Sequence, residues 1–446
     1  MYKKITLLLF LFLMMNGICA QKKLNTTLVE QQTRAYAGAG DWDGITELGK
    51  EALRKGIDFY YLRYRMGVAW YMKKNYHQAA HNLRKAWEQN PGDGLLQEYL
   101  YFSLVFSGRE MEARYFASGI SIHEKNRMGI PDGKLTEKVH VLVDVGSSDD
   151  QKGIKNFFPE PTAPDGSRFI SRSHRVFQVG LLHPLSQSLS VYHAYTHAQK
   201  DHFVYSLSDG NEVIDPNTRS LINQYYLSGI WRLVRDFRLV TALHYIHLTL
   251  PGQAQVLPGR PGVPLATTPA TTWGELVGSL ALYRDMRYLT VGLSGNFSNL
   301  NDGRQRQGDL LLAFYPLGNL SLYTASTFSL QHETAGNGNQ TERLVFFQRI
   351  GGRLASWLWV EGFLSLGEMN NFVRYDGALV FNAMDMIRQQ AGAKTTLTFS
   401  PHLAVYVNYT TISHQSQYRP VSSGGQPTKP LNFLSQTITG GIIWSL

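Results

Sequence analysis

Residues 432–446 read N-F-L-S-Q-T-I-T-G-G-I-I-W-S-L and alternate between apolar and small polar side chains. A β-strand points successive side chains to opposite faces, so this stretch has two chemically different faces. One face carries Leu434, Ile438, Ile442, Trp444 and Leu446. The other carries Ser435, Thr437 and Thr439. The segment is therefore predicted to be a strand with one apolar and one polar side.

The same alternation recurs backwards through the chain to about residue 137, for example in residues 224–233, 288–297 and 402–411. The segments are about 8 to 15 residues long, close to the length that a tilted strand needs to cross a lipid bilayer. A closed barrel satisfies every backbone N–H and C=O without water, which lipid requires. We therefore expect residues 137–446 to form an antiparallel transmembrane β-barrel.

Turn signals give the strand count. Short turns are expected near residues 184–185, 235–236, 284–285, 316–318, 355–356 and 400–401. Longer loops are expected at residues 147–168, 200–219, 251–271, 299–307, 334–340, 367–389 and 415–431. These turns and loops separate about 14 strands, an even number that leaves both ends of the barrel on the side of the short turns. Five tryptophans near strand ends are expected to form interfacial girdles: Trp231, Trp273, Trp357, Trp359 and Trp444.

Composition agrees with a barrel. Charged residues are 17% and aromatic residues 12% of the 446, and mean hydropathy is −0.22. Disordered chains are less aromatic, and helical membrane proteins are more hydrophobic. The net charge of +9 is spread along the chain, so no nucleic-acid partner is expected.

The N-terminus looks like an export signal. Residues 1–20 comprise a charged start, a short apolar run and a small residue at Ala20, which predicts cleavage before Gln21. Cys19 would leave with the signal, and the mature chain would then contain no cysteine. We expect the protein in the outer membrane of a Gram-negative bacterium, with outer-membrane lipid around its barrel.

Between residues 21 and 129 the pattern becomes helical and repeats every 34 residues, as Ile45, Ala79 and Ala113 illustrate. Tyr36, Trp70 and Leu104 show the same step, and the middle copy adds Gly67, Tyr76, Ala86 and Pro91. This pattern resembles tetratricopeptide (TPR) repeats, in which small residues let paired helices approach closely. The resemblance implies a periplasmic helical domain that binds a protein partner, with surface candidates Tyr60, Tyr61, Arg63 and Tyr64. Residues 130–136 are predicted to be a linker.

Sorting barrel residues by strand face predicts seven charged side chains in the lumen: Arg232, Arg238, Glu275, Arg349, Arg353, Glu361 and Lys394. They are either a solvated wall with internal ion pairs or a selectivity lining that favours anionic solutes or polysaccharide. The loop at residues 367–389 carries too many apolar side chains to stand free in solvent. It is expected to fold into the lumen as a plug, to dock on another protein, or to pack against neighbouring loops.

No catalytic or cofactor motif stands out. His193 with His197, and His244 with His247, do not have the spacing to clasp a metal ion from a strand. We expect no enzyme, no cofactor and no metal site. The sequence alone does not exclude an outer-membrane hydrolase, which would need Ser, His and an acid clustered at the outer rim.

Helical repeats fused to an outer-membrane barrel are similar in architecture to bacterial exopolysaccharide-export porins. That resemblance implies a channel or translocon component whose repeats recruit a periplasmic partner. The main alternative is a non-conducting barrel that anchors a TPR adaptor in a secretion or envelope-assembly machine. An outer-membrane enzyme is the remaining alternative.

Overall fold

The computed structural model describes residues 24–130, 136–148, 165–208, 211–234, 236–250, 254–256, 264–267, 270–383, 385–420 and 430–446. The predicted signal sequence, most of the predicted linker and parts of five predicted loops lie outside these residues. The chain divides into two compact units, Met1–Ser103 and Leu104–Leu446. The division by contacts falls inside a helix, earlier than the change from helix to strand that the sequence shows at about residue 130.

The first unit consists of antiparallel helices joined by short turns. Its helices are α2 (Thr26–Ala39), α3 (Trp42–Arg54), α4 (Tyr60–Met72), α5 (Tyr76–Trp87) and most of α6 (Gly94–Phe106). Asn25, Asp41 and Asn75 cap α2, α3 and α5, each accepting a hydrogen bond from the backbone three residues on. Short turns at Gly40 and at residues 73–75 separate α2 from α3 and α4 from α5.

Small residues bring these helices together. A Cβ atom at Gly67 on α4 would lie 2.4 Å from Cγ of Leu83 on α5, so only glycine fits this contact. Ala79 and Ala86 are fully buried, and Val29, Ile45, Leu62 and Met66 belong to one apolar core. Helical pairing and small-residue packing are thus confirmed, whereas membership of the TPR family stays a prediction.

The second unit begins with the end of α6, followed by α7 (Glu110–Ser118) and α8 (Ile122–Met128). In α7, Arg114 pairs with Glu137 at the start of the barrel, and Glu110 pairs with Lys138. None of the helices in the described part of the chain is long and apolar enough to cross a bilayer.

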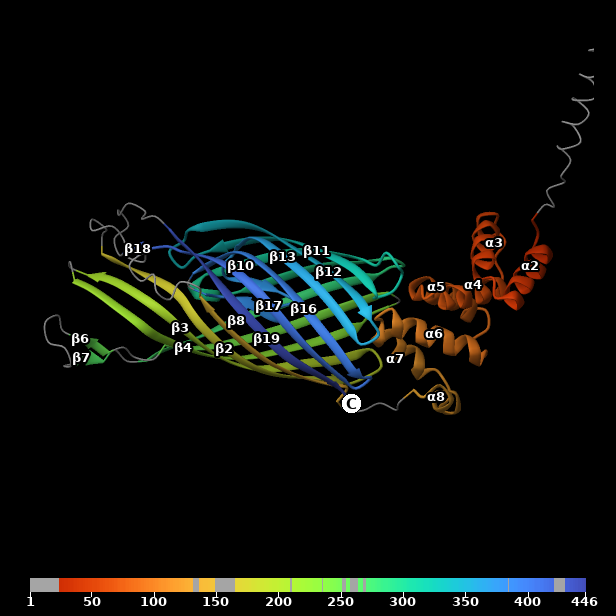
Figure 1. The fold of residues 1–446 in the computed structure, drawn as a ribbon, viewed down its shortest axis with the longest axis horizontal. Coiled ribbons are helices and arrows are strands. Elements are labelled where there is room, and N and C mark those ends of the chain that lie inside the picture. Colours follow the sequence, from red (N-terminus) through yellow and green to blue (C-terminus); the bar gives the residue numbers. More distant parts are fainter. Residues whose placement is uncertain are drawn as a thin grey trace, which may run out of the picture. The chain divides into compact units, whose positions relative to one another are not determined.

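The rest of the second unit is a closed antiparallel barrel of 14 strands (Figure 1). The strands are β1 (Lys138–Ser148), β2 (Gly166–Pro184), β3 (Leu189–Ser208), β4 (Asn211–Arg232), β5 (Phe237–Leu250), β8 (Thr271–Asp285), β9 (Leu289–Ser298), β10 (Arg304–Phe314), β11 (Leu322–Thr334), β12 (Gln340–Ala355), β13 (Leu358–Met369), β16 (Met386–Ser400), β17 (Leu403–Ser416) and β19 (Leu431–Ser445). Closure comes from β1, which pairs with β2 on one side and with β19 on the other. The predicted strand number and the six short turns are confirmed.

The barrel is apolar outside and polar inside. Leu293, Leu344 and Ile438 turn outward and are 53–69% exposed, whereas the alternate residues Asn296, Ser435 and Thr437 are buried inside. This inverts the arrangement of a soluble domain, because the exterior of the wall is the apolar face. Such an exterior is suited to contact with lipid chains.

Two predictions about the barrel are wrong in part. The expected loop at residues 200–219 is a strand pair instead, because β3 and β4 remain paired from Lys200↔Ser220 out to Ser208↔Asn211. Two strands can stay paired beyond the bilayer, where apolar and polar side chains need not alternate. The alternation in the sequence therefore ends before the hairpin does. Trp273 turns inward and packs with Ile246 and Leu248, so it is not part of an exterior girdle. Trp231, Trp357 and Trp444 are 40–55% exposed near the short turns, as expected.

Short pieces outside the ladder complete the described unit. β6 (Ala254–Val256) pairs with β7 (Pro264–Thr267), and β18 (Arg419–Pro420) pairs with the beginning of β2. Between β13 and β16, β14 (Phe372–Arg374) and β15 (Leu379–Phe381) form a two-stranded hairpin of their own. This hairpin builds the candidate site.

Candidate functional site

Residues 370–383, here called the plug, fold back into the barrel. Their tip turns through Tyr375, Asp376 and Gly377, which all have positive φ angles. Phe372 and Val373 are 1–2% exposed, and Phe372 packs with Val345, Met369 and Ile387. Of the three predicted arrangements of this loop, folding into the lumen as a plug is the one observed. Its apolar side chains are buried there, which explains why the segment is too hydrophobic for a free loop.

Buried polar contacts fix the base of the plug to β10 and β11. The Gln331 amide donates to the carbonyl oxygen of Asn371 at 2.6 Å. Glu333 accepts from the side chain of Asn371 and pairs with Arg343 on β12. Gln307 on β10 bonds both the N–H and the C=O of Val373. The wall thus supplies a partner for plug backbone groups that would otherwise be buried without one.

The tip of the plug is bonded to β4, β5 and β8. The Tyr283 hydroxyl donates to the carboxylate of Asp376, and the Tyr226 hydroxyl donates to its carbonyl oxygen at 3.1 Å. His244 Nδ1 donates to the carbonyl oxygen of Gly377 at 2.8 Å. Because these wall residues are inward-facing, the plug lies against one half of the barrel, formed by β4 to β11.

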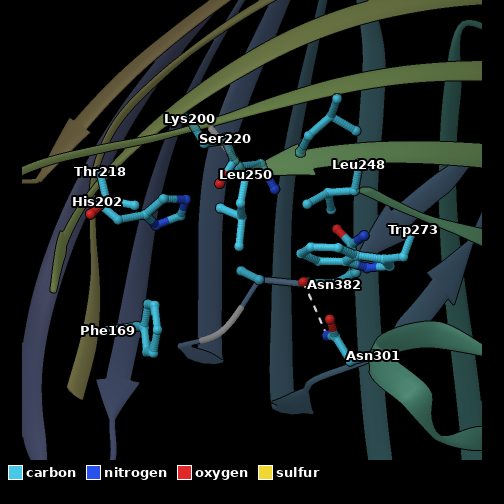
Figure 2. Close-up of a pocket in the computed structure, with 12 residues that line it drawn as sticks. Phe169, Lys200, His202, Thr218, Ser220, Leu248, Leu250, Trp273, Asn301 and Asn382 are labelled. Atoms are coloured by element: carbon cyan, nitrogen blue, oxygen red, sulfur yellow. Dashed lines mark hydrogen bonds between the residues drawn. The ribbon is translucent and has the colours of Figure 1, made fainter. Parts of the chain in front are cut away.

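The return arm of the plug is tied to β8 and to the short 3₁₀ helix η2 (Leu300–Asp302). Glu275 accepts from the side chain of Asn382 and from the backbone of Asn301, both at 2.8 Å. Asn301 also donates to the carbonyl oxygen of Asn382 at 3.1 Å, as the dashed line in Figure 2 shows. The neighbouring pocket, lined by Trp273, Leu248, His202 and Lys200 among others, has a volume of only about 30 Å³ (Figure 2). It is too small for an organic solute.

A much larger space remains on the opposite side of the plug. This lumen cavity has a volume of about 560 Å³ and is bounded by inward residues of β1–β4, β12, β13, β16, β17 and β19 together with the plug. Its wall is rich in hydroxyl and amide side chains, including Ser173, Gln178, Thr196, Asn408 and Thr439. Sites for small molecules commonly have volumes in this range. The plug therefore narrows the lumen without filling it.

The lumen cavity carries more positive than negative side chains. Five cationic residues line it, Arg172, Lys200, Arg349, Arg374 and Lys394, against two acidic ones, Asp144 and Glu361. Asp144 is engaged by His174 Nε2 at 2.7 Å and accepts from the Thr439 hydroxyl at 2.6 Å. Glu361 accepts a hydrogen bond from Tyr323 and lies 3.8 Å from Arg349. The surplus positive charge creates a potential that favours anions.

The charged residues predicted in the lumen divide into three groups. Arg349, Glu361 and Lys394 line the lumen cavity. Glu275 holds the plug from the other half of the barrel. Arg232 and Arg238 line a separate pocket of about 170 Å³ at the short-turn end, beside residues of α7, where Arg232 lies over the ring of Tyr115 at 3.7 Å.

Arg353, the seventh predicted residue, does not line the lumen cavity. It is exposed at the β12–β13 turn and its guanidinium donates to the carbonyl oxygens of Ala355 and Ser356. Arg353 pairs with Trp359 in the same register as the preceding residues of β12, and the register shift follows it, before Ala355. Its parity is therefore unchanged, and its position near the end of β12 places the side chain at the rim.

Several site residues were missed from the sequence. Arg374 lies 3.6 Å from the ring of Phe347 and donates to Ser365 and Gln390. It belongs to a loop, so no strand pattern points to it. Asp144 and His174 do follow the inward parity of β1 and β2, and their pairing across that ladder was a signal available in the sequence.

The four helical-surface candidates lie on α4, and most of them have partners within the first unit. The Tyr60 hydroxyl donates to Asp93 at 2.6 Å and its ring stacks on Tyr64. Burial, together with the bond to Asp93, raises the pKa of Tyr60, and burial raises the pKa of Tyr64 to about 12. Arg63 is held by Asp58 and Asn82. Tyr61, 55% exposed, is the one of the four that offers a broad free surface.

Comparison with known proteins assigns neither a family nor a function to this chain. No protein-family model matches the sequence, and no curated protein is detectably similar to it. Among solved structures, a Pseudomonas aeruginosa FadL homologue is similar at 9% identity and a TM-score of 0.41, over 69% of this chain and 90% of that one. A bacterial polysaccharide outer-membrane secretin has 12% identity and a TM-score of 0.35, over 69% and 98%. An anion-selective porin from Comamonas acidovorans has 8% identity and a TM-score of 0.29, over 70% and 100%. At these identities and TM-scores the similarities support no statement about the function of this chain.

Proposed function

We propose that this chain is an outer-membrane channel whose plug narrows the conducting path to the lumen cavity. The apolar exterior of the closed barrel supports a position in lipid. The barrel interior supports a polar path, because the inward residues of most strands carry hydroxyl, amide or charged groups. The proposal thus combines the outer-membrane location and the transport role that the sequence predicts.

One observation carries the channel proposal: a polar cavity of about 560 Å³ lies beside the plug. A barrel that served only as an anchor could fill its lumen with packed side chains, as small barrels do. Here, wall residues such as Gln178, Thr196 and Thr439 face open space. A passage of this character suits small hydrophilic solutes.

The proposed channel prefers anions. The cationic residues that line the cavity outnumber the acidic ones by five to two. Rings and clusters of Arg and Lys lower the electrostatic barrier for anions in pores. Small anionic solutes, acidic saccharides included, are the substrate class that this charge supports.

The N-terminal helices are proposed to face the periplasm and to recruit a protein partner. The 34-residue repeat and its resemblance to TPR pairs support this role. Tyr61 supports it further, because an exposed tyrosine beside Arg65 presents a large amphipathic contact surface.

A second candidate is a non-conducting anchor for the helical unit. The plug favours it, since buried bonds from Gln307, Gln331 and Glu275 hold the hairpin in the lumen. A plug held by these bonds would block any conducting path along the half of the barrel formed by β4 to β11.

Conductance in planar bilayers separates the two. The full-length protein is compared with a variant in which residues 372–383 are replaced by a short Gly-Ser link, and heat-modifiable gel mobility verifies that both barrels are folded. Small anion-selective channels from the full-length protein, and larger ones from the variant, are expected for the channel. If only the variant forms channels, the plug seals the barrel of the unmodified protein. If neither protein conducts, the channel proposal fails and the anchor is favoured.

A further inference from the structure

We infer that Ser435, His414 and Asp385 form a hydrolytic site for carboxylic esters in the outer half of the lumen. His414 Nε2 and Ser435 Oγ are 2.7 Å apart, and His414 Nδ1 and Asp385 Oδ2 are 2.5 Å apart. A hydroxyl, an imidazole and a carboxylate in this order are the constituents of a serine nucleophile with its general base and orienting acid. This activity goes beyond the proposed channel and does not depend on conduction.

The sheet places the two reacting groups side by side. Ile412 on β17 is opposite Ser435 on β19, and the next inward pair is His414 opposite Phe433. His414 and Ser435 are therefore diagonal neighbours on the inward face, within reach of each other's side chains. Asp385 directly precedes β16, whose residue Ile387 is the register partner of His414 on its other side. Three consecutive chain passes thus supply the three groups.

The surroundings hold the imidazole and the carboxylate in place. The His414 ring stacks on Phe433, with centroids 4.7 Å apart and an interplanar angle of 6°. Asp385, 2% exposed, also accepts a hydrogen bond from Ser171 on β2. With Asp385 facing Nδ1, the proton of the neutral imidazole is favoured on Nδ1, which leaves Nε2 free to accept from Ser435.

The contact between Asp385 and His414 is close but not aligned as a hydrogen bond in this conformation. Catalytic hydrogen bonds in ligand-free sites are often poorly aligned and tighten when substrate binds. The proximity of the two charged partners is what stabilises the imidazolium that forms during attack.

An unpartnered hydroxyl lies next to the nucleophile. Thr437 is the next inward residue on β19 after Ser435 and lines the same lumen cavity. Its Oγ1 is buried and makes no hydrogen bond in the structure, although buried hydroxyls normally have a partner. A developing oxyanion on a substrate carbonyl would provide an acceptor for this hydroxyl. Thr437 is therefore assigned as the oxyanion donor.

The cavity defines the substrate class. Ser435 and His414 line it together with neighbouring apolar side chains of one cluster, Ile387, Phe381 and Ile412. Hydroxyl, amide and cationic side chains form the rest of the wall. Such a division fits an ester with a short apolar acyl group and a polar alcohol part. The cavity of about 560 Å³ is too small for a phospholipid with two long chains.

The chemistry balances with water as the only co-reactant. Ser435 Oγ attacks the ester carbonyl carbon as His414 Nε2 takes the hydroxyl proton, and the carbonyl oxygen becomes the oxyanion facing Thr437. Collapse breaks the bond to the alcohol oxygen, which receives the proton from His414. Water then attacks the acyl-enzyme, His414 takes a proton from it, and the acid leaves as Ser435 regains its hydrogen.

The test uses full-length protein folded in detergent, with folding verified by heat-modifiable gel mobility. A fluorophosphonate probe, which reacts covalently with activated serines, is expected to label the unmodified protein, and peptide mass spectrometry is expected to place the label on Ser435. Hydrolysis of p-nitrophenyl acetate is measured in parallel and compared with the long-chain palmitate ester, which is expected to be a poor substrate.

Variants assign the roles. Ser435→Ala is expected to abolish labelling, and it and His414→Gln are each expected to lower kcat/KM by about 10³-fold or more. Thr437→Val is expected to lower kcat about 10²-fold with little change in KM, the signature of a donor used in the transition state. Ser329→Ala is the matched control, since Ser329 is a buried serine of β11 that does not line the lumen cavity, and it is expected to keep full labelling. Absence of labelling in the folded, unmodified protein, labelling at another residue, or undiminished hydrolysis by Ser435→Ala would overturn the inference and leave a polar network that only packs the lumen.

Discussion

The side chain of Gln307 bonds both backbone polar groups of a single residue, Val373. Its Nε2 donates to the Val373 carbonyl oxygen at 2.7 Å, and its Oε1 accepts from the Val373 N–H at 3.1 Å. A side-chain amide on the wall thereby replaces the neighbouring strand that the plug backbone lacks. Substitution of Gln307 alone would remove both of these hydrogen bonds between the wall and the plug.

Gln307→Ala is expected to loosen the plug. The substitution leaves a buried N–H and C=O without their partner, at a cost of about 1–3 kcal/mol for each unsatisfied group. In planar bilayers the variant is expected to show larger and more frequent openings than the unmodified protein. Gln436→Ala removes a side chain of the same size from an exposed position on β19, outside the lumen cavity and the plug contacts, and serves as the control. Identical traces for the Gln307 variant and the control would show that the plug does not regulate conduction.

Leu293→Arg is expected to destabilise the barrel. Leu293 is 60% exposed in the middle of β9 on the outer face, where an arginine would meet lipid chains. The cost at mid-bilayer is about 2–4 kcal/mol. Thr196→Arg places the same side chain in the lumen cavity, and it is expected to cost less. Urea titration of folding into lipid vesicles measures both, and equal costs would contradict the assignment of the outer face to lipid.

Gly67→Ala is expected to destabilise the helical unit by about 1–3 kcal/mol, because its Cβ overlaps Leu83 and its neighbours are tightly packed. Gly38 in α2 has no atom within 4 Å of the position of a Cβ, and Gly38→Ala is expected to stabilise by about 0.5–1 kcal/mol. Thermal unfolding followed at 222 nm in the full-length protein reports on the helices. The prediction fails if both alanines shift the midpoint in the same direction.

The Glu30–Arg65 pair makes the stability of the helical unit depend on pH. A bidentate hydrogen bond from Arg65 holds the pKa of Glu30 below its usual value. A carboxyl whose folded pKa is lowered contributes stability above its unfolded pKa and loses it as the pH falls through the folded value. Because the pair is partly exposed, the contribution is expected to be about 1 kcal/mol or less.

Glu30→Gln isolates that contribution. The unmodified protein is expected to melt at a higher temperature than the variant at pH 7, and the difference is expected to shrink below about pH 4. A gap of constant size from pH 7 to pH 3 would show that the charge on Glu30 does not contribute.

Strand alternation predicted the barrel because strands can cross lipid only when every backbone N–H and C=O is paired, which closure achieves. The even strand number and the short turns followed from the same constraint. The hairpin of β3 and β4 extends further than the alternation of its side chains. Lys200 pairs with Ser220, and Asp215 pairs with Val204, through backbone groups that do not depend on the side chains. Glu361 and Lys394 line the lumen cavity, whereas Arg353 has the same inward parity as Arg349 but lies near the end of β12, where its side chain bonds the turn.

The parity of a residue in a strand predicts the face on which its side chain lies, but it does not predict which residues meet at the site. Arg374 and Asp385 belong to a loop whose path is set by distant partners, Ser365 on β13 and Ser171 on β2 among them. Hydrophobicity predicted that residues 367–389 would be buried, but not which wall would receive them. Ser435 and His414 each carry the expected inward parity, and only the register of β17 and β19 shows that they are neighbours.

The seam between β1 and β19 sets the order in which the molecule can be made. β1 is the first barrel strand in the chain and β19 the last, yet β1 pairs with β19 along its whole length. Until these two strands meet, each leaves an edge of the sheet unpaired. The plug and the strands that bond its base and tip, β4, β5, β8, β10 and β11, all precede β19 in the chain. The plug can therefore fold onto its half of the wall before the seam closes.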